Sequence, residues 1–442
     1  MPGEAVTPRS TGARGRRRRR AEPTATTQQE EAGRQGARAG TRRGGGGRRA
    51  AERERERERL AQRFYEETLR RGVRGLAAEF RELRAYQPAL ATAEACVANR
   101  ERNRYRDVAC LDDSRVQLQQ GDNDYIHASF VRGCRRDKQY ICTQAPLAGT
   151  VAHFWQMTWE QGARLIVMLC RTVESNQRKC ADYWPTEEGE AGAMLFQAAS
   201  GSFRVVKTRA SQREFLDEPH HVLVVNRLSL TRLDGVAGSE GSGGTPPPPD
   251  ETATAAAATA TTAAATTAAA ADEGGHPSRR AKKQRQRTIV HVVWETWPDK
   301  GVPSTRRAIL RLRHKIMGYD RLSAMETKEQ PAPIIIHCSA GIGRTGTVVL
   351  LDNCLGHLET GRTELLVAEE TRRLRNQRIH SVQTDHQYLY VHAAIVDFLA
   401  ERWLRRFTDD PRREQFQRDF ERYVRDGELP GRHPAHAMPA FL

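Results

Sequence analysis

Apolar residues along this chain occur in two patterns: at the spacing of a helix face, and in short continuous runs that are typical of strands. Between residues 73 and 83 they recur at steps of three and four, which predicts the apolar face of a helix. This face comprises Val73, Leu76, Phe80 and Leu83. From there to about residue 232, short β-rich runs such as LIVML (165–169) and HHVLVV (220–225) alternate with helical patterns. The alternation favours an α/β or α+β fold.

The C-terminal part also contains both predicted strands and predicted helices. Strand-like runs follow at TIVHVVW (288–294) and IIIH (334–337), and TVVLLDNCLGHLE (347–359) predicts a buried helix. Two more helices are expected at about 385–406 and 411–424. The apolar face of the last one comprises Phe416, Phe420 and Tyr423.

Two segments lack the apolar residues that a folded core requires. Residues 1–51 are rich in Arg and Gly, and residues 234–287 combine Gly, Ser, four consecutive Pro and a long Ala/Thr run. We expect the first to be a disordered basic tail and the second to be a low-complexity surface insertion between two strands. One folded domain is therefore predicted over 52–426, followed by a C-terminal tail at 427–442.

Positive charge is concentrated in the N-terminal tail. Residues 1–50 hold thirteen Arg and four Glu, so +9 of the net charge of +16 lies there. Such a tail favours weak contact with nucleic acid or another anionic surface, or a nuclear-import signal. A tail that is only solvated explains the composition equally well.

The composition argues against a membrane protein and against a secreted one. The sequence has no run of 18 apolar residues, and its N-terminus lacks the apolar segment of a secretory signal. The eight Cys form neither a CxxC pair nor a Cys/His cluster with metal spacing, so reduced thiols and no metal site are expected. We expect a cytoplasmic protein, with the nucleus as a second location.

The stretch IIIHCSAGIGRTG (334–346) carries the strongest chemical signal. A buried strand leads into a loop that ends at the start of a helix, where free backbone N–H groups and the helix dipole favour an anion. Gly341 and Gly343 let the loop curl so that successive amides point inward. Arg344 can close the ring with two hydrogen bonds to phosphate oxygens. The cradle would be formed by Ser339, Ala340, Gly341, Ile342 and Gly343.

Cys338 lies in this cradle. The amides, the helix start and the guanidinium favour its thiolate, and such surroundings lower a thiol pKa from about 8.5 to roughly 3.5–7.5. Thr345 can donate its hydroxyl to the sulfur, and His337 is expected to order the loop through backbone contacts. In-line attack on a bound phosphorus would give a phosphocysteine intermediate without a metal or cofactor. Other cysteine-dependent phosphatases and sulfurtransferases share such a cradle, so the loop alone does not choose among them.

Expelling an alkoxide or phenoxide from phosphorus needs a general acid. WETWPDKGVP (294–303) supplies Asp299 on a loop bracketed by Pro and Gly residues, which predicts a rigid flap with hinges. The Asp lies 39 residues before Cys338 and follows a predicted strand. Asp299 is therefore the candidate acid.

At this point the sequence resembles the tyrosine-specific protein tyrosine phosphatases of the non-receptor type, with a single catalytic domain. The resemblance extends over about residues 60–400, apart from the insertion. Its further motifs are NRYRDV (103–108), DYIHASFV (124–131), YICTQAPL (140–147), HFWQMTWEQ (153–161), KCADYWP (179–185) and VQTDHQY (382–388). The resemblance implies an α/β fold with a central, highly twisted mixed β-sheet flanked by α-helices.

The resemblance also implies roles for residues outside the loop. Tyr105 would stack on the substrate ring and set the depth of the pocket, and the Asp107 carboxylate would bind backbone N–H groups of the substrate peptide. A pocket of that depth admits phosphotyrosine, whereas phosphoserine is too short to reach the thiolate.

Four more residues match family positions near the phosphate. Gln383 would position water against the phosphocysteine, with the general acid now acting as base, and Gln387 would support it one helical turn later. Glu174 would orient Arg344, and Lys179 would lie near the phosphate and the general acid.

The chain departs from the family pattern at three positions. His127 stands where the family usually has Asn, Ala145 where it has Gly, and His380 where it often has a small residue. We expect the first two departures to affect packing more than chemistry. His380 would either crowd the rim of the pocket or face solvent there.

Together these residues predict a monomeric enzyme that hydrolyses phosphotyrosine on tyrosine-phosphorylated proteins in signal transduction. Two other hypotheses stay open. One is a catalytically silent phosphotyrosine-binding module. The other is a nucleic-acid or anionic-surface binder whose working part is the basic tail.

Overall fold

The computed structural model describes residues 25–89, 91–121, 123–217, 220–233, 286–327, 331–361 and 364–426. The chain divides into two compact units. The smaller unit ends at Glu56 and contains the first part of helix α1 (Ala25–Arg84), and the larger unit begins at Arg57. The candidate site lies wholly in the larger unit.

Helix α1 begins inside the segment that was expected to be a disordered tail. Residues 25–51 of that segment are helical, while 1–24 lie outside the described residues. Residues 25–51 hold seven Gly, which disfavour a helix, but also six Ala and six Arg, which are good helix formers. At Gly72 φ is 63° and the helix is kinked. The lack of apolar residues predicted the absence of a core, but it does not prevent helical backbone hydrogen bonds.

The larger unit is built on a nine-stranded mixed sheet with the order β1-β2-β3-β11-β4-β10-β9-β8-β7. The four neighbours β3, β11, β4 and β10 run parallel, and the pairs on either side of them are antiparallel. The strands are β1 (Arg115–Gln117), β2 (Tyr125–Val131), β3 (Tyr140–Thr143), β4 (Leu165–Met168), β7 (Met194–Ala198), β8 (Gly201–Asp217), β9 (His221–Leu233), β10 (Gln286–Trp294) and β11 (Ile334–His337). A separate hairpin joins β5 (Val173–Glu174) to β6 (Gln177–Arg178).

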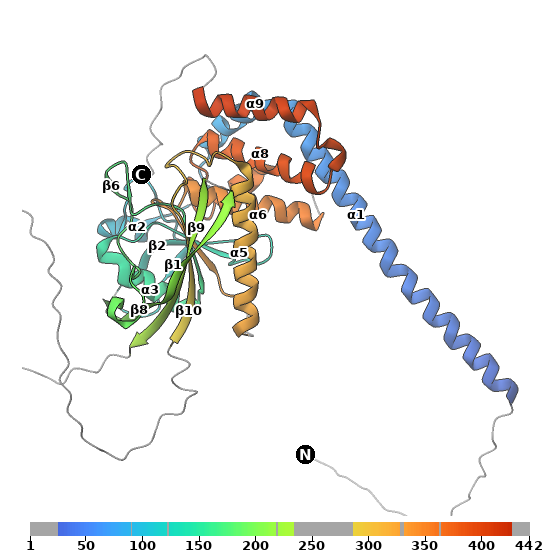
Figure 1. Ribbon diagram of the computed structural model, residues 1–442, viewed down its shortest axis with the longest axis horizontal. Coiled ribbons are helices and arrows are strands. Elements are labelled where there is room, and N and C mark those ends of the chain that lie inside the picture. Colours follow the sequence, from blue (N-terminus) through green and yellow to red (C-terminus); the bar gives the residue numbers. More distant parts are fainter. Residues whose placement is uncertain are drawn as a thin grey trace, which may run out of the picture. The chain divides into compact units, whose positions relative to one another are not determined.

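Helices flank this sheet, as the sequence predicted. Figure 1 shows α3 on one side of the sheet and α5 and α6 on the other. The helices after α1 are α2 (Glu94–Ala98), α3 (Val151–Glu160), α5 (Arg306–Thr327), α6 (Gly343–Thr360), α7 (Val367–Arg375), α8 (Asp385–Arg402) and α9 (Pro411–Asp426). Short 3-10 turns lie at η1 (Arg100–Arg102), η2 (Ala148–Thr150), η3 (Glu190–Gly192) and η4 (Arg405–Phe407). The predicted mixed α/β fold is confirmed.

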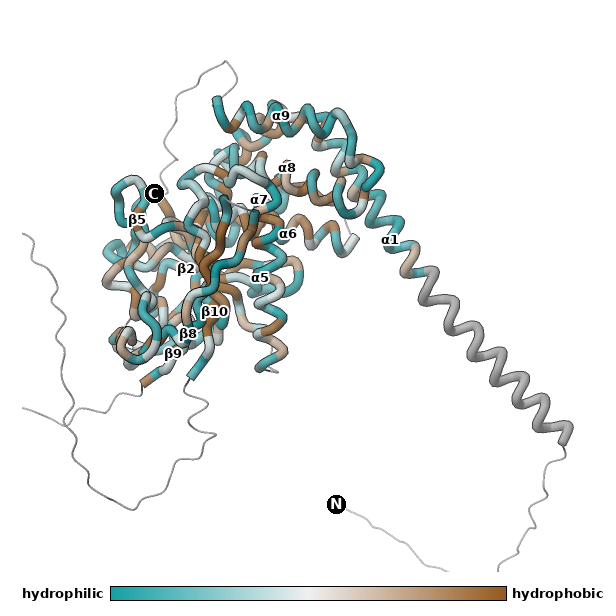
Figure 2. Tube along the Cα trace, in the orientation of Figure 1, coloured by the Kyte–Doolittle hydropathy of each residue, from teal (hydrophilic) through white to brown (hydrophobic). Residues whose placement is uncertain are grey.

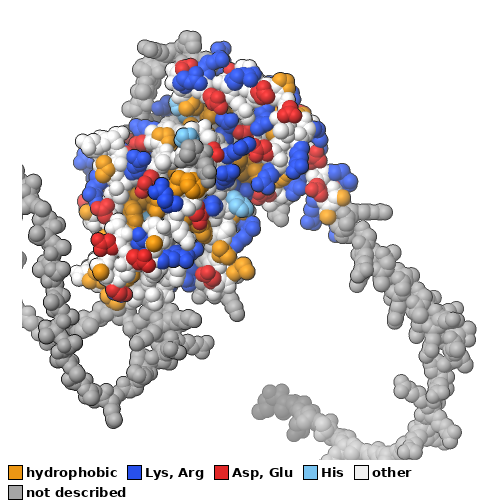
Figure 3. Space-filling view, in the orientation of Figure 1, with side chains coloured by type: hydrophobic (Ala, Val, Ile, Leu, Met, Phe, Trp, Pro, Cys, Tyr) orange, Lys and Arg blue, Asp and Glu red, His pale blue; other side chains and the backbone are white. Residues whose placement is uncertain are grey.

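The core lies along the central parallel strands. Both β4 and β11 are buried at every position, because parallel strands are covered on both faces. Figure 2 shows this hydrophobic centre between more polar helices, and on the face drawn in Figure 3 basic and acidic side chains are interspersed. Among the described residues, no helix has the length and apolarity that crossing a membrane would require.

The predicted insertion falls between β9 and β10, which are antiparallel neighbours. Residues 234–285 lie outside the described part of the chain. The C-terminal end of the insertion differs from the prediction, because Gln286 and Arg287 already pair with Thr231 and Leu230. Strand β10 therefore begins two residues earlier than its apolar pattern indicated.

A buried carboxylate joins β3, α5 and α6. Asp352 of α6 is 3% exposed and accepts hydrogen bonds from Arg135 (2.7 Å), Arg313 (2.7 Å), Gln139 (3.1 Å) and the Tyr140 hydroxyl. Burial alone would raise the pKa of Asp352, but the two guanidinium groups outweigh burial and lower it. The carboxylate is therefore charged and compensates the buried Arg313 and the partly exposed Arg135.

We predict that Asp352→Asn destabilises the protein by about 1–3 kcal/mol, because buried hydrogen bonds to the carboxylate are lost and Arg313 keeps only Glu359 as a counter-ion. Urea unfolding at pH 7 measures this loss. The folded pKa of Asp352 is lowered, so its contribution is present above the usual value of 3.8 and is lost as the pH falls through the folded pKa. The wild type and the variant should therefore converge in acid. Asp137→Asn removes an exposed pair with Arg132 and should cost less than about 1 kcal/mol, so equal losses in the two variants would contradict the prediction.

Candidate active site

Strand β11 delivers Cys338 to the carboxyl end of the parallel strands. The strand is buried between β3 and β4, and α6 begins at Gly343, five residues after the cysteine. Cys338 is 3% exposed. At Gly341 φ is 70°, and a Cβ atom there would lie 2.1 Å from the carbonyl oxygen of Thr143. Only glycine fits this turn.

The first carbonyl groups of the loop point away from its centre. Nδ1 of His337 lies 3.2 Å from the carbonyl oxygen of Cys338, as expected for a histidine that orders the loop. The N–H of Ala145 donates to the carbonyl oxygen of Ser339 at 3.0 Å. In a trans peptide the C=O and N–H groups point in opposite directions. Each outward carbonyl therefore turns the next N–H group inward.

Arg378 holds the next two carbonyl groups of the loop. This arginine is 1% exposed and donates to the carbonyl oxygens of Gly341 (3.2 Å) and Ala340 (2.9 Å). It also contacts His127 Nδ1 (3.0 Å) and Ser129 (3.3 Å). The sequence analysis missed Arg378, because a single Arg in a polar stretch gives no signal of where its side chain points.

The inward amides act on the thiol. Burial alone would raise the pKa of Cys338, but the Arg344 guanidinium, the Thr345 hydroxyl and the N–H groups of Thr345 and Gly341 together lower it. No hydrogen bond of the buried Thr345 oxygen meets ordinary distance and angle limits among the described residues, so its hydroxyl is free to turn toward the sulfur. Burial without such a cradle has the opposite result, since it raises the pKa of Cys142 to about 12.

Arg344 lies at the floor of the site with its charge compensated. It is 2% exposed and donates two hydrogen bonds to the Glu174 carboxylate, at 2.6 and 2.9 Å. It also donates to the carbonyl oxygen of Trp297 (3.1 Å) and to Asp299 Oδ1 (3.2 Å). Glu174 thus binds the Arg344 guanidinium through both of its carboxylate oxygens.

The segment between β10 and α5 brings Asp299 over the loop. The indole of the buried Trp297 donates to the carbonyl oxygen of Gly301 at 3.0 Å, which closes the turn on itself. Lys179 Nζ lies 3.4 Å from Asp299 Oδ2. The Thr384 hydroxyl donates to the carbonyl oxygen of Lys300 at 3.1 Å and ties the segment to the start of α8. The predicted flap thus has its carboxylate between two cations.

The two predicted glutamines come from the start of α8. The Gln383 N–H donates to Gln387 Oε1 at 2.9 Å, and Thr384 caps the helix by accepting from the Gln387 N–H. A Cβ atom at Gly343 would lie 3.1 Å from side-chain atoms of both glutamines. Glycine at this position therefore leaves room for both amides beside the loop.

Tyr105 forms the opposite wall. Its hydroxyl lies 2.7 Å from the Ser339 hydroxyl, and the neighbouring Arg104 donates to the carbonyl oxygens of Pro146 (2.7 Å) and Ala145 (3.1 Å). These bonds fix the segment that carries Tyr105. Arg104 is a second positioning residue that the sequence analysis did not single out.

One cavity of about 510 Å³ brings most of the predicted residues together. Its predicted lining residues are Tyr105, Asp107, Lys179, Asp299, Cys338, Ser339, Ala340, Gly343, Arg344, Gln383 and Gln387. The cavity is also lined by Val108, Ser175, Gln177 and Lys300, which were not predicted. Five predicted residues do not line it, namely His337, Gly341, Ile342, Thr345 and Glu174. The contacts described above place His337, Gly341, Thr345 and Glu174 directly behind the loop or its arginine.

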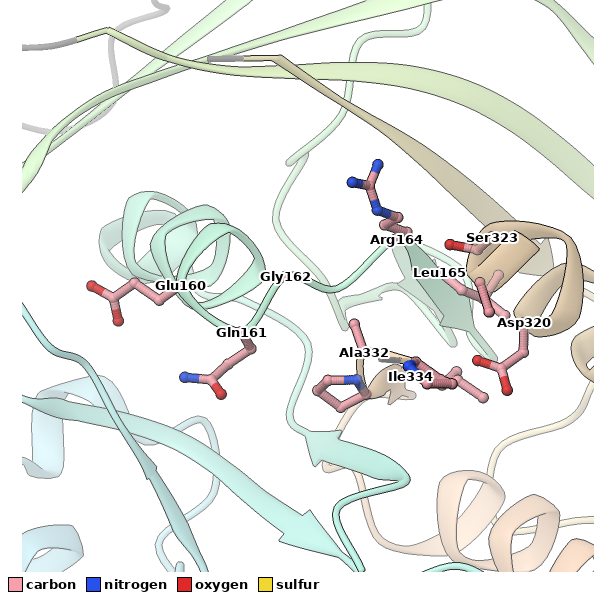
Figure 4. A pocket seen from close by; sticks show the side chains of 12 residues that line it. Glu160, Gln161, Gly162, Arg164, Leu165, Asp320, Ser323, Ala332 and Ile334 are labelled. Carbon is pink, nitrogen blue, oxygen red and sulfur yellow. The ribbon is translucent and has the colours of Figure 1, made fainter. Parts of the chain in front are cut away.

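A second hollow, of about 240 Å³, lies at the opposite end of the parallel strands. Figure 4 shows side chains from the end of α3, the start of β4, α5 and the segment that enters β11 around it. Its Asp320 is already paired with Arg136 at 2.9 Å. None of the predicted site residues lines this hollow. In open α/β sheets, ligands bind at the carboxyl ends of the strands, which favours the cavity at Cys338.

None of the three departures from the family pattern lines the cavity. His127 and Ala145 are buried and contact Arg378 and the Ser339 carbonyl group, so they act through packing. The prediction for His380 was wrong in both of its forms. The side chain is 2% exposed and does not line the cavity. Closeness in sequence to Gln383 did not fix the direction of the side chain, which a turn with φ of 59° directs inward.

Comparison with known proteins identifies the same family that the sequence motifs indicated. The family model for protein-tyrosine phosphatases matches residues 99–219 and 267–397. Tyrosine-protein phosphatase non-receptor type 2 of Rattus norvegicus is 33% identical over 299 residues, which cover 68% of this chain and 56% of that protein. Type 9 of Mus musculus is 31% identical over 344 residues, which cover 75% of this chain and 47% of that protein. The chain thus spans about half the length of these relatives.

A solved structure shares the fold. It was reported as "Structural basis of PTPN18 fingerprint on distinct HER2 tyrosine phosphorylation sites", and the match has a TM-score of 0.56 at 24% identity. The match covers 77% of this chain and 99% of the other. The fold, the ordered motifs and the family model agree, and the chain belongs to the protein-tyrosine phosphatase family.

Proposed function

We propose that this chain hydrolyses phosphotyrosine on protein substrates through a phosphocysteine intermediate, without a metal. The observation that carries the proposal is the lowered pKa of Cys338 in a cavity that also contains Arg344 and Asp299. The names of the relatives, which are tyrosine-protein phosphatases, support it.

In the first step, the Cys338 thiolate attacks phosphorus in line with the phenolic oxygen. The S–P bond forms as the P–O bond to the tyrosine breaks, and Asp299 gives its proton to the leaving phenolate. Arg344 and the loop amides stabilise the charge on the three remaining oxygens. Lys179, 3.4 Å from Asp299, lies where it can orient the acid.

In the second step, water replaces the phenol. Gln383 holds the water against the phosphocysteine, and the Asp299 carboxylate takes a proton from it. The water oxygen bonds to phosphorus as the S–P bond breaks, which releases phosphate and the thiolate. Gln387 supports Gln383 by accepting a hydrogen bond from the Gln383 backbone N–H at its Oε1. The same carboxyl group therefore acts as acid and then as base.

The lining of the cavity supports tyrosine as the substrate residue. Tyr105 is fixed at one wall by its bond to Ser339, and the thiol lies at the floor. An aryl phosphate reaches from the mouth to the sulfur and can stack on the Tyr105 ring. Asp107 is exposed at the mouth, where it can accept backbone N–H groups of a peptide. Phosphoserine lacks the length.

We predict that Cys338→Ser abolishes turnover of a phosphotyrosyl peptide but leaves its binding largely intact, because the anion cradle remains. A serine alkoxide is not available at neutral pH. Steady-state kinetics and peptide-binding titrations measure the two effects, and Cys134→Ser, outside the cavity, should retain activity. Residual activity above about one part in a thousand, roughly 4 kcal/mol of barrier, would exclude covalent catalysis by Cys338.

Asp299→Ala should lower the rate on a phosphotyrosyl peptide by about 10²- to 10⁴-fold, because the leaving phenolate is no longer protonated. An aryl phosphate with an activated leaving group should lose less. The two substrates are compared in one assay, with Asp182→Ala, an exposed carboxylate near the site, as the matched control. Equal losses on both substrates would remove Asp299 from the role of acid.

The pH at which Cys338 is half alkylated should depend on the Arg344 guanidinium. The pKa of Cys338 is lowered, so iodoacetamide should react with it at a pH where ordinary thiols are protonated. Because Arg344 makes the largest of the contributions that lower this pKa, Arg344→Ala should move the alkylation midpoint to higher pH. An unchanged midpoint would mean that the amides alone hold the thiolate.

A further inference from the structure

A buried tyrosine joins two buried histidines beneath the loop. The Tyr183 hydroxyl lies 2.8 Å from His291 Nε2 and 2.7 Å from His337 Nε2. All three side chains are inaccessible to solvent. The Tyr183 backbone is itself fixed, because the Trp155 indole donates to its carbonyl oxygen at 2.8 Å.

This contact is the middle of a longer chain of hydrogen bonds. On one side His291 Nδ1 lies 3.2 Å from Asn226 Nδ2, and Asn226 Oδ1 accepts from the Ser211 hydroxyl at 2.7 Å. On the other side His337 Nδ1 lies 3.2 Å from the carbonyl oxygen of Cys338. We call the series from Asn226 to Cys338 the hydrogen-bond chain.

Strand register explains why these side chains meet. Asn226 of β9 stands directly opposite His291 of β10, and His291 pairs with Ile166 of β4. Ile166 pairs with Ile335 of β11, two residues before His337. Residues two apart on a strand share a face, so both histidines and the asparagine lie on one face of the sheet. The Tyr183 hydroxyl reaches both histidines from the segment that follows β6.

Both histidines are neutral near pH 7. Burial lowers the pKa of His291 to about 3, with His337 as a further cause. Burial likewise lowers the pKa of His337 to about 4, with Arg104 and Arg344 contributing in the same direction. Each ring therefore carries one N–H group and one bare nitrogen.

The two ends of the chain require the same proton positions, because the Asn226 oxygen accepts from Ser211 and leaves its amide N–H to donate, while the Cys338 oxygen can only accept. The Cys338 oxygen can only accept, so His337 carries its proton on Nδ1 and leaves Nε2 bare. Tyr183 must then donate to His337, and its oxygen must accept from His291 Nε2–H. His291 Nδ1 is left bare and accepts from the Asn226 amide. Met168 Sδ lies 3.8 Å from the Tyr183 hydroxyl but is a far weaker acceptor.

We propose that Asn226 and His291 are positioning residues, which fix the direction of this hydrogen-bond chain and so hold the backbone carbonyl group of Cys338. The proposal deepens the proposed function, since it concerns the same cysteine. The outer residues are needed because a Tyr183 oxygen without the His291 donor is a buried acceptor left unsatisfied. The Tyr183 hydroxyl could then donate to Met168 instead of to His337. His337 could switch to the tautomer whose Nδ1 is bare, and the hydrogen bond from Nδ1 to the Cys338 oxygen would be lost.

The proton positions can be measured directly. We expect ¹⁵N NMR of the histidine side chains in the full chain at pH 7 to show opposite tautomers, with Nδ1 protonated in His337 and Nε2 protonated in His291. His291→Phe and His337→Phe assign the signals. The same tautomer in both rings, or a charged ring at pH 7, would overturn the proposal.

The effect on the cysteine is tested by a double-mutant cycle. His291→Phe should slow Cys338 alkylation at pH 7 by roughly three- to tenfold, the effect of one hydrogen bond, and raise its pH midpoint. In a Tyr183→Phe background the same substitution should change the rate by less than about twofold, because the chain is already cut. His291→Gln, whose amide can donate to Tyr183, should restore at least half of the loss.

His392→Phe is the matched control, because this buried histidine has no hydrogen-bond partner on either ring nitrogen among the described residues. It should leave the alkylation profile unchanged. A loss at His291 that persists without Tyr183, or that His392→Phe reproduces, would show a general packing effect and overturn the proposal. The histidine tautomers and the rate of Cys338 alkylation are both measured without a phosphorylated substrate. A result that contradicts this proposal can therefore be told apart from a failure of the proposed phosphatase activity.

Discussion

The ion pair between Arg344 and Glu174 is the interaction on which the site depends. A guanidinium group stays charged at any physiological pH, and at 2% exposure it has lost nearly all of its water. Glu174 replaces that water with two hydrogen bonds. The carboxylate is presented by the β5–β6 hairpin, whose turn residues Ser175 and Asn176 have positive φ. The hairpin thus allows a buried cation to face the thiol.

A charged Arg344 in turn explains the behaviour of Cys338. The other buried cysteines with a shifted pKa have it raised, and Cys180 reaches about 12, because burial disfavours an anion. Cys338 is equally buried and moves the other way. The difference comes from the guanidinium and the inward N–H groups rather than from the residue type. The reactivity that we propose is therefore a property of the loop geometry, which the sheet and α6 impose.

The parts of this arrangement that the sequence predicted are those carried by consecutive residues. The run of three Ile before His337 identified β11, and the register of Cys338, Gly341 and Arg344 identified the cradle. Such patterns need no knowledge of distant segments. Helix α1 and His380 show the limit, because composition does not exclude a helix and sequence neighbours do not share a side-chain direction.

The residues that the sequence analysis missed act across the fold. Tyr183 and His291 are 108 positions apart, and Arg378 reaches the loop carbonyl group of Gly341 from 37 positions away. Each is an ordinary buried side chain by type, and only the paired strands and the packed helices bring it to the loop. Their shared effect is nevertheless simple. Each loop carbonyl group that is bound from outside leaves an N–H group pointing inward, so the anion site is made by satisfying the other half of every peptide.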